Sequence, residues 1–219
     1  MHLLLTDRLS CPRCGPRFGL VLLTERVMDR RVLAGSLGCP NCRDRFPVTA
    51  GFADLRIPPR GPLHPETPPP EPGQAEALRL AALLGVSEGP AHVALVGAVA
   101  AHAAALAALV AGLEAVAVGT ELLGVPEQAG VSRLTARPGL PFRDAALQGV
   151  VLSGSADLLE EAARVTGPAG RVVWTDAPGT ASGRAERAGL LVLLEEGGTL
   201  VAGRAGPRAP SAGRRLPVV

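Results

Sequence analysis

The chain has 219 residues, of which 47% are hydrophobic but only 2% aromatic, so Leu, Val and Ala must fill its core. A net charge of +2 is too small to indicate nucleic acid by charge alone, and we attribute the use of Arg without any Lys to genomic base composition. Residues 1–5 lack the basic start of a signal peptide, and the Ala- and Gly-rich run 93–113 is a poor membrane span. We therefore expect a cytoplasmic protein with no membrane span.

Every cysteine of the chain lies in one of two CPxC motifs near the N-terminus. Cys11 and Cys14 form the first motif, and Cys39 and Cys42 form the second. Two thiolates separated by two residues can bind one metal ion from a tight loop, and two such pairs complete a tetrahedral site. We predict a structural zinc ion here. A redox dithiol pair is the alternative, and iron is compatible with the same ligands.

The composition divides the chain into a small unit, a linker, a larger unit and a tail. Residues 1–56 contain predicted strands over 20–23 and 31–34, but few large side chains, so we expect the metal to be required for folding. Residues 57–73 are Pro-rich and predict an extended linker. Residues 74–203 form the larger unit, and the Arg- and Pro-rich residues 204–219 form a tail.

The larger unit alternates between helical and strand patterns. We predict helices over 74–84, 100–113 and 156–165, strands over 91–96, 115–118, 149–153 and 171–175, a turn over 167–170, and a hairpin of strands 190–195 and 199–202. This alternation predicts an α/β fold with a Rossmann-like, mostly parallel sheet that ends in an antiparallel hairpin. The single Trp174 lies in a predicted strand, so we expect it in the core.

The N-terminal unit resembles the Trm112-like zinc-ribbon family over about residues 3–56. The similarity rests on the segments 9–14 (LSCPRC), 38–42 (GCPNC), 45–48 (RFPV) and 51–55 (GFADL). In that family the small zinc domain mainly activates or stabilises methyltransferases that modify tRNA, rRNA or release factors. The resemblance therefore implies a protein partner, either a methyltransferase, a component of the translation machinery or a larger assembly.

The larger unit resembles the class I S-adenosylmethionine (SAM) methyltransferase fold over residues 74–203. The similarity rests on the segments 140–152 (LPFRDAALQGVVL), 160–165 (EEAARV) and 167–172 (GPAGRV). The family's first strand ends in an acidic residue followed by a Gly-rich turn that approaches the cofactor. Here Leu95 stands in place of the acid, Gly97 keeps one glycine, and Val99 and Ala101 occupy the other glycine positions.

The second cofactor anchor of that family is an acid at the end of the second strand, which holds the ribose. Gly119 stands at this place, and only Glu121, two residues later, could substitute for the acid. His102 stands where a cofactor-facing helix would begin, and we interpret it as a capping histidine. We identify no catalytic residue.

We interpret the chain as a non-catalytic scaffold, a pseudo-methyltransferase with a Trm112-like ribbon. The alternative is a divergent SAM-dependent methyltransferase that uses Gly97, Val99, Ala101 and Glu121 at the cofactor and the ribbon as an activator in cis. A third hypothesis is RNA binding by the arginines around the cysteine motifs, namely Arg13, Arg17, Arg43 and Arg45.

Overall fold

The computed structural model describes residues 1–64, 73–154 and 156–204, so residues 65–72 of the predicted linker, residue 155 and residues 205–219 of the predicted tail lie outside the described residues. The N-terminal part contains the 3₁₀-helix η1 (Leu3–Arg8) and the strands β1 (Ser10–Cys11), β2 (Gly15–Gly19), β3 (Val21–Met28), β4 (Arg31–Gly38), β5 (Arg45–Thr49) and β6 (Phe52–Arg56). The strands of the larger part are β7 (Ala91–Val96), β8 (Leu113–Val118), β9 (Val131–Arg137), β10 (Leu147–Ser153), β11 (Thr166–Thr175), β12 (Leu191–Glu196) and β13 (Thr199–Gly203). Its helices are α1 (Gln74–Leu84), η2 (Gly97–His102), α2 (Ala103–Leu109), η3 (Ala156–Leu158), α3 (Leu159–Val165) and α4 (Ala181–Arg187).

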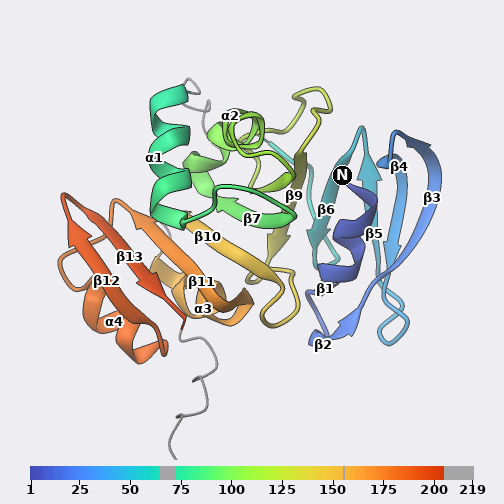
Figure 1. Cartoon of the computed structure of the whole chain (residues 1–219). Coiled ribbons are helices and arrows are strands. Elements are labelled where there is room, and N and C mark those ends of the chain that lie inside the picture. The colour runs from blue at the N-terminus through green and yellow to red at the C-terminus, as the bar shows by residue number, and fades with distance from the viewer. Residues whose placement is uncertain (65–72, 155, 205–219) are drawn as a thin grey trace, which may run out of the picture.

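Strands from both parts of the chain form one continuous 11-stranded sheet, in the order β12-β13-β11-β10-β7-β8-β9-β6-β5-β4-β3 (Figure 1). From β7 the chain adds β8 and β9 on one side, then returns to add β10 and β11 on the other, all in parallel. This reversal of direction defines a Rossmann-like, doubly wound sheet. The antiparallel pair β12–β13 closes one end, as the sequence predicts.

The two units predicted on either side of the Pro-rich segment meet within this sheet. Strand β6 of the first unit pairs in parallel with β9 of the second, from Phe52 opposite Arg133 to Arg56 opposite Arg137. A second connection runs beside it, because the backbone N–H of Ser10 donates to the carbonyl of Pro141 at 2.9 Å. Backbone hydrogen bonds therefore join the ribbon to the larger unit at two places.

Helices cover both faces of the doubly wound part. On one face, Leu80 of α1 and Leu106 of α2 pack in a core cluster with Leu95 of β7. On the other face, α3 and α4 pack on a second cluster that includes Trp174, which is 1% exposed and confirms its predicted place in the core. This second cluster continues into the ribbon, where it includes Phe46. The two units thus share one hydrophobic core.

Several element boundaries follow from local sequence signals. Helix α1 spans the predicted residues 74–84 and ends at Gly85, whose φ of 68° permits the left-handed C-terminal cap. The hairpin β12–β13 turns at Gly197 and Gly198, which have φ values of 55° and 74°. Two consecutive residues with positive φ are the requirement of a tight hairpin turn that matches the twist of its strands.

Three predictions for the larger unit need correction. The predicted helix 100–113 is a 3₁₀-helix over 97–102 and a short α-helix over 103–109, and Leu113 already belongs to β8. The helix stops because Val110 is extended and Gly112 has a φ of 75°. The predicted turn 167–170 lies inside β11. These residues form an irregularity in the strand, with a shift in its pairing with β10 and a φ of 60° at Ala169. The predicted helix 156–165 begins as the 3₁₀ turn η3.

Candidate metal centre and cofactor cleft

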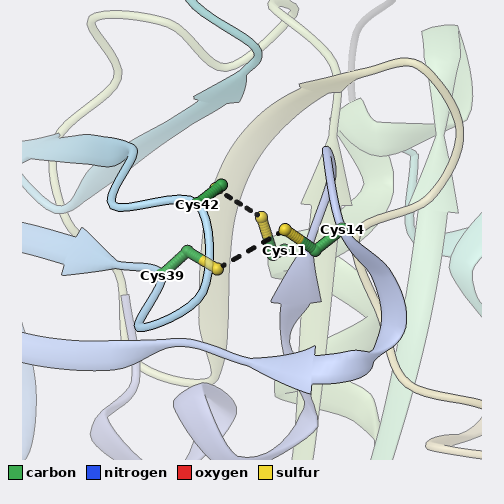
Figure 2. A group of neighbouring side chains, drawn as sticks. All are labelled: Cys11, Cys14, Cys39 and Cys42. Atoms are coloured by element: carbon green, nitrogen blue, oxygen red, sulfur yellow. Dashed lines mark hydrogen bonds between the residues drawn. The ribbon is translucent and has the colours of Figure 1, made fainter.

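The four cysteines come from two turns that face each other across the ribbon (Figure 2). Cys11 ends β1, and the chain reverses into β2 at Gly15, whose φ of 86° favours glycine. Cys39 follows β4, and its loop is closed because the N–H of Arg43 donates to the carbonyl of Cys39 at 3.0 Å. Each motif thus forms the tight knuckle that the CPxC spacing predicts.

The sulfur atoms lie at the separations that a tetrahedral metal site requires. Cys11 Sγ is 3.6 Å from Cys42 Sγ, and Cys39 Sγ is 3.8 Å from Cys14 Sγ (Figure 2). All four sulfur atoms lie within 4.8 Å of one another. A Zn–S bond of about 2.3 Å places the corners of a tetrahedron about 3.8 Å apart. The four side chains therefore fit a zinc ion in their centre.

The electrostatics of the cluster differ between its members. Burial acts to raise the pKa of the Cys39 thiol, but hydrogen bonds from the backbone N–H groups of Cys42 and Asn41 and with the side chains of Cys11 and Cys42 together lower that pKa to about 7. Burial raises the pKa of the Cys11 thiol. The Asn41 amide also donates to Cys14 Sγ at 3.2 Å. Metal ligation needs thiolates, and the hydrogen bonds at Cys39 favour the ionised form of that thiol. Four thiolates leave no coordination position for water, which is typical of a structural site.

The arginines around the knuckles are exposed, and one of them forms an ion pair. Arg13 Nε donates to the Asp44 carboxylate at 2.6 Å and so ties one knuckle to the other. Arg17, Arg43 and Arg45 are exposed on β2, on the second knuckle and on β5. RNA binding by this set stays a prediction.

A cleft lies at the carboxyl ends of the parallel strands, where doubly wound sheets bind their ligands. It has a volume of about 570 Å³. Its walls come from the ends of β7, β8 and β9, from Asp157 and Leu158 after β10, and from Pro62, Leu63 and His64 of the predicted linker. The segment that leaves the ribbon therefore borders this cleft.

Of the three predicted cofactor residues that follow β7, only one borders the cleft. Gly97 borders it with a φ of 80°, and a Cβ added there would lie 2.9 Å from the carbonyl oxygen of Ser153. The chain then winds into the 3₁₀-helix η2, where Val99 and Ala101 are each only 6% exposed. Val99 packs in the core cluster beneath α1 and α2 and borders a separate hollow of about 360 Å³.

Glu121 borders the cleft just after the end of β8. A Cβ added to Gly119 would overlap the Glu121 carboxylate, so this side chain folds back over the glycine at the place of the missing acid. His102 precedes α2 and is only 9% exposed, but its side chain makes no capping hydrogen bond. His102 thus occupies the N-cap position of α2, as predicted, without capping the helix through its side chain.

A buried group of charges at the junction of the two units was missed by sequence reasoning. Arg31 of β4 donates through Nη1 to both carboxylate oxygens of Glu114 on β8, at 2.9 and 3.0 Å, and through Nε to Glu127 at 2.6 Å. Arg133 of β9 donates to Glu127 at 3.0 Å and to the carbonyl of Ala50 at 2.6 Å. Because these partners lie far apart in the chain, no local pattern in the sequence reveals them.

Comparisons with known proteins add likenesses in fold only. No protein-family model matches the sequence, and no curated protein matches it. Among solved structures, a provisionally assigned sarcosine dimethylglycine methyltransferase from Galdieria sulphuraria is 16% identical with a TM-score of 0.43, over 55% of this chain and 62% of that one. The [4+2]-cyclase SpnF is 12% identical with a TM-score of 0.47, over 55% and 58%. This chain thus spans less than two thirds of the length of both.

A third likeness is to the complex between the Trm112 methyltransferase activator of Haloferax volcanii and a provisionally assigned methyltransferase. It is 18% identical with a TM-score of 0.44, and covers 60% of this chain and 89% of that one. At such identities and TM-scores these likenesses carry no conclusion about activity or partners. Within the described residues, no helix is both long and apolar enough to cross a membrane.

Proposed function

We propose that the protein is a non-catalytic binding protein, in which a zinc-stapled, Trm112-like ribbon and a methyltransferase-like unit that does not bind SAM form one sheet. The observation that carries the proposal is the burial of Val99 and Ala101, at 6% exposure each, at positions where a cofactor turn needs open glycine backbone. Leu95, in place of the acid, is fully buried. A buried Leu offers no hydrogen bond to a cofactor, and a β-branched Val disfavours the backbone angles of a Gly-rich turn.

The proposed partner is another protein, in the cytoplasm. Both outer strands of the sheet support this, because no further strand among the described residues pairs with their outer edges and because both carry exposed apolar side chains. On β12, Leu191 is 64% and Leu193 is 50% exposed, and on β3, Met28 is 60% and Val21 is 54% exposed. Natural sheets usually protect such edges, and proteins commonly bind by adding a strand to an open one. A methyltransferase, a translation component or a subunit of a larger assembly would suit this mode of binding.

A methyl-transfer assay tests the non-catalytic proposal. The full-length, zinc-loaded protein is incubated with tritium-labelled SAM and an extract of its source cells that supplies RNA and protein. The expected result is no methyl incorporation above that of the extract alone, while an unrelated active methyltransferase serves as positive control. Incorporation that depends on added protein would overturn the proposal.

A divergent, active methyltransferase is the second candidate, and one specific observation favours it. The cleft of about 570 Å³ is large enough for a nucleoside-containing ligand and is bordered by Gly97 and Glu121. If Glu121 holds the ribose, the substitution Glu121→Ala should abolish both SAM binding and methyl transfer. Unchanged activity in that variant would remove the role of Glu121.

A further inference from the structure

We propose that a second cavity, on the open face of the ribbon, binds a small amphiphile with an apolar body and one anionic head, such as a medium-chain carboxylic acid. The cavity has a volume of about 630 Å³ and lies over β4, β5 and β6, separate from the metal site. This volume is within the range of cavities that enclose drug-sized ligands. The inference does not depend on whether the protein is catalytic.

The walls of the cavity are mostly apolar and come from three parts of the chain. Side chains of the ribbon sheet form its floor, the linker residue Leu63 forms one side, and the loop before β9 forms the other. The apolar members are Leu33, Pro47, Ala50, Phe52, Leu63, Leu123, Val125 and Pro126. An apolar group that enters this space leaves water for a hydrophobic surface, which is the main favourable contribution to binding.

The loop that forms one wall is held in place by Arg133. This side chain is only 2% exposed, and its guanidinium donates to the carbonyls of Leu122 and Val125 in the loop and of Ala50 in the ribbon. Glu127, at the end of the loop, accepts from Arg133 and from Arg31. The cavity is therefore formed before a ligand arrives, which reduces the entropy lost on binding.

The charges around the cavity favour an anion. Its two acids are already neutralised within the protein, Asp54 by Arg56 at 2.8 Å and Glu127 by Arg31 at 2.6 Å. Arg26, which lines the cavity from β3, has no ion pair or hydrogen bond through its guanidinium to any residue that the structure describes. The Nε of Arg133 is buried and finds no acceptor among the same residues. The cavity thus offers a positive charge without a partner among the described residues, whereas both of its negative charges are already paired.

Calorimetric titration of the zinc-loaded full chain with decanoate, below its micellar concentration, tests this proposal. We expect saturable binding of one decanoate per chain, and weaker binding of decan-1-ol and decyltrimethylammonium, which share the apolar body but lack the anionic head. Arg26→Gln should weaken decanoate binding about tenfold, because a charge-assisted hydrogen bond is lost. Arg187→Gln, at an exposed arginine of α4, is the control and should leave binding unchanged.

A second variant tests the apolar part of the site. Thr49 is exposed at the end of β5 and lines the cavity, so Thr49→Trp should fill the space without disturbing the core and abolish decanoate binding. A thermal melt of each variant confirms that it is folded. The proposal is overturned if decanoate does not saturate, if the three decyl compounds bind equally, or if Arg26→Gln binds as the wild type does. Binding of an apolar peptide with a free carboxylate, but not of decanoate, would instead assign the cavity to a protein partner.

Discussion

Single residues hold the ribbon, and the cleft at the carboxyl ends of the parallel strands, in their present form. The four cysteine sulfurs lie within 4.8 Å of one another, which brings up to four negative charges together when the thiols ionise. Without a cation these thiolates would repel one another, so we expect metal binding to be coupled to the folding of the ribbon.

Replacing one ligand should therefore release the metal and destabilise the ribbon. Cys39→Ser removes one of the four sulfurs, and we expect the zinc content to fall from one ion per chain to nearly none. The free energy of unfolding should fall by several kcal/mol, because structural zinc contributes on the order of 10 kcal/mol at pH 7. Elemental analysis and thermal melts measure both effects. Asn41→Ala, which removes only the amide that donates to Cys14, is the control and should keep the metal. Full zinc content in Cys39→Ser would contradict the assignment.

Substitution of Gly97 measures how tightly the turn after β7 is packed. It has a φ of 80°, and an added Cβ would lie 2.9 Å from a backbone oxygen, whereas Gly124 has a φ of 82° and open space around it. Both substitutions to Ala incur backbone strain of about 1 kcal/mol, but only Gly97→Ala also displaces a neighbour. We expect a loss of about 2–3 kcal/mol for Gly97→Ala and about 1 kcal/mol for Gly124→Ala in denaturant melts. Equal losses would show that the turn has room to spare.

His92 makes the stability depend on pH. Burial, followed by the charges of Arg8 and His2, lowers its pKa from 6.5 to about 4. The unfolded chain therefore binds a proton between these pH values and the folded chain does not, so stability falls as the pH drops from 6.5 towards 4. Denaturant melts across this range should show a smaller fall in the variant His92→Gln. The exposed His64 provides the control, and His64→Gln should keep the wild-type slope. An unchanged slope in His92→Gln would contradict this role.

At the scale of elements, the ion pair between β4 and β8 joins the ribbon to the larger unit. The side chains of Arg31 and Glu114 are each only 10% exposed. Breaking a buried pair leaves one charge without compensation and typically costs about 3–5 kcal/mol, whereas exposed pairs contribute below about 1 kcal/mol.

Arg31→Met should therefore lower the free energy of unfolding by about 3–5 kcal/mol. The exposed pair Arg79–Glu76 on α1 supplies the comparison, and Arg79→Met should lower it by less than about 1 kcal/mol. A double-mutant cycle with Glu114→Gln isolates the coupling between Arg31 and Glu114. Similar losses in Arg31→Met and Arg79→Met would mean that the buried pair does not hold the two units together.

The elements that the sequence predicts well are those with a local signal. The Ala and Leu spacing of α1 and the glycine turn of β12–β13 predict elements that the structure has, and the cysteine spacing predicts the close approach of the four sulfurs. Strand β9 was missed because its polar residues are buried. Ser132 and Arg133 are 0% and 2% exposed, and their partners come from distant segments, for example the backbone N–H of His2 and the carbonyl of Ala50. Such partners exist only once the sheet has formed.

Two further features of the structure were not predicted, each for its own reason. Helix α4 was missed because its sequence, ASGRAER, includes a glycine that weakens helical propensity. The passage of Leu63 and His64 along the cofactor cleft depends on the path of the chain between the two units, which no pattern of residues specifies.

At the scale of the whole molecule, the parallel pairing of β6 with β9 makes the ribbon an extension of the larger sheet. One hydrophobic cluster runs through both units, from Phe46 in the ribbon to Trp174 beside α4. Loss of the metal should therefore loosen the strands of the larger unit as well as those of the ribbon. A binding role fits this architecture, since β3 and β12, the outer strands of the described sheet, lie at its opposite ends (Figure 1).

Calorimetric titration of the zinc-loaded full chain with S-adenosylhomocysteine tests the central claim most directly, because this product binds the same site as SAM and cannot react. We expect no saturable heat at ligand concentrations up to about 1 mM, which corresponds to a binding free energy weaker than about −4 kcal/mol. A dissociation constant in the micromolar range would contradict the account and establish that the cleft beside Gly97 still holds the cofactor.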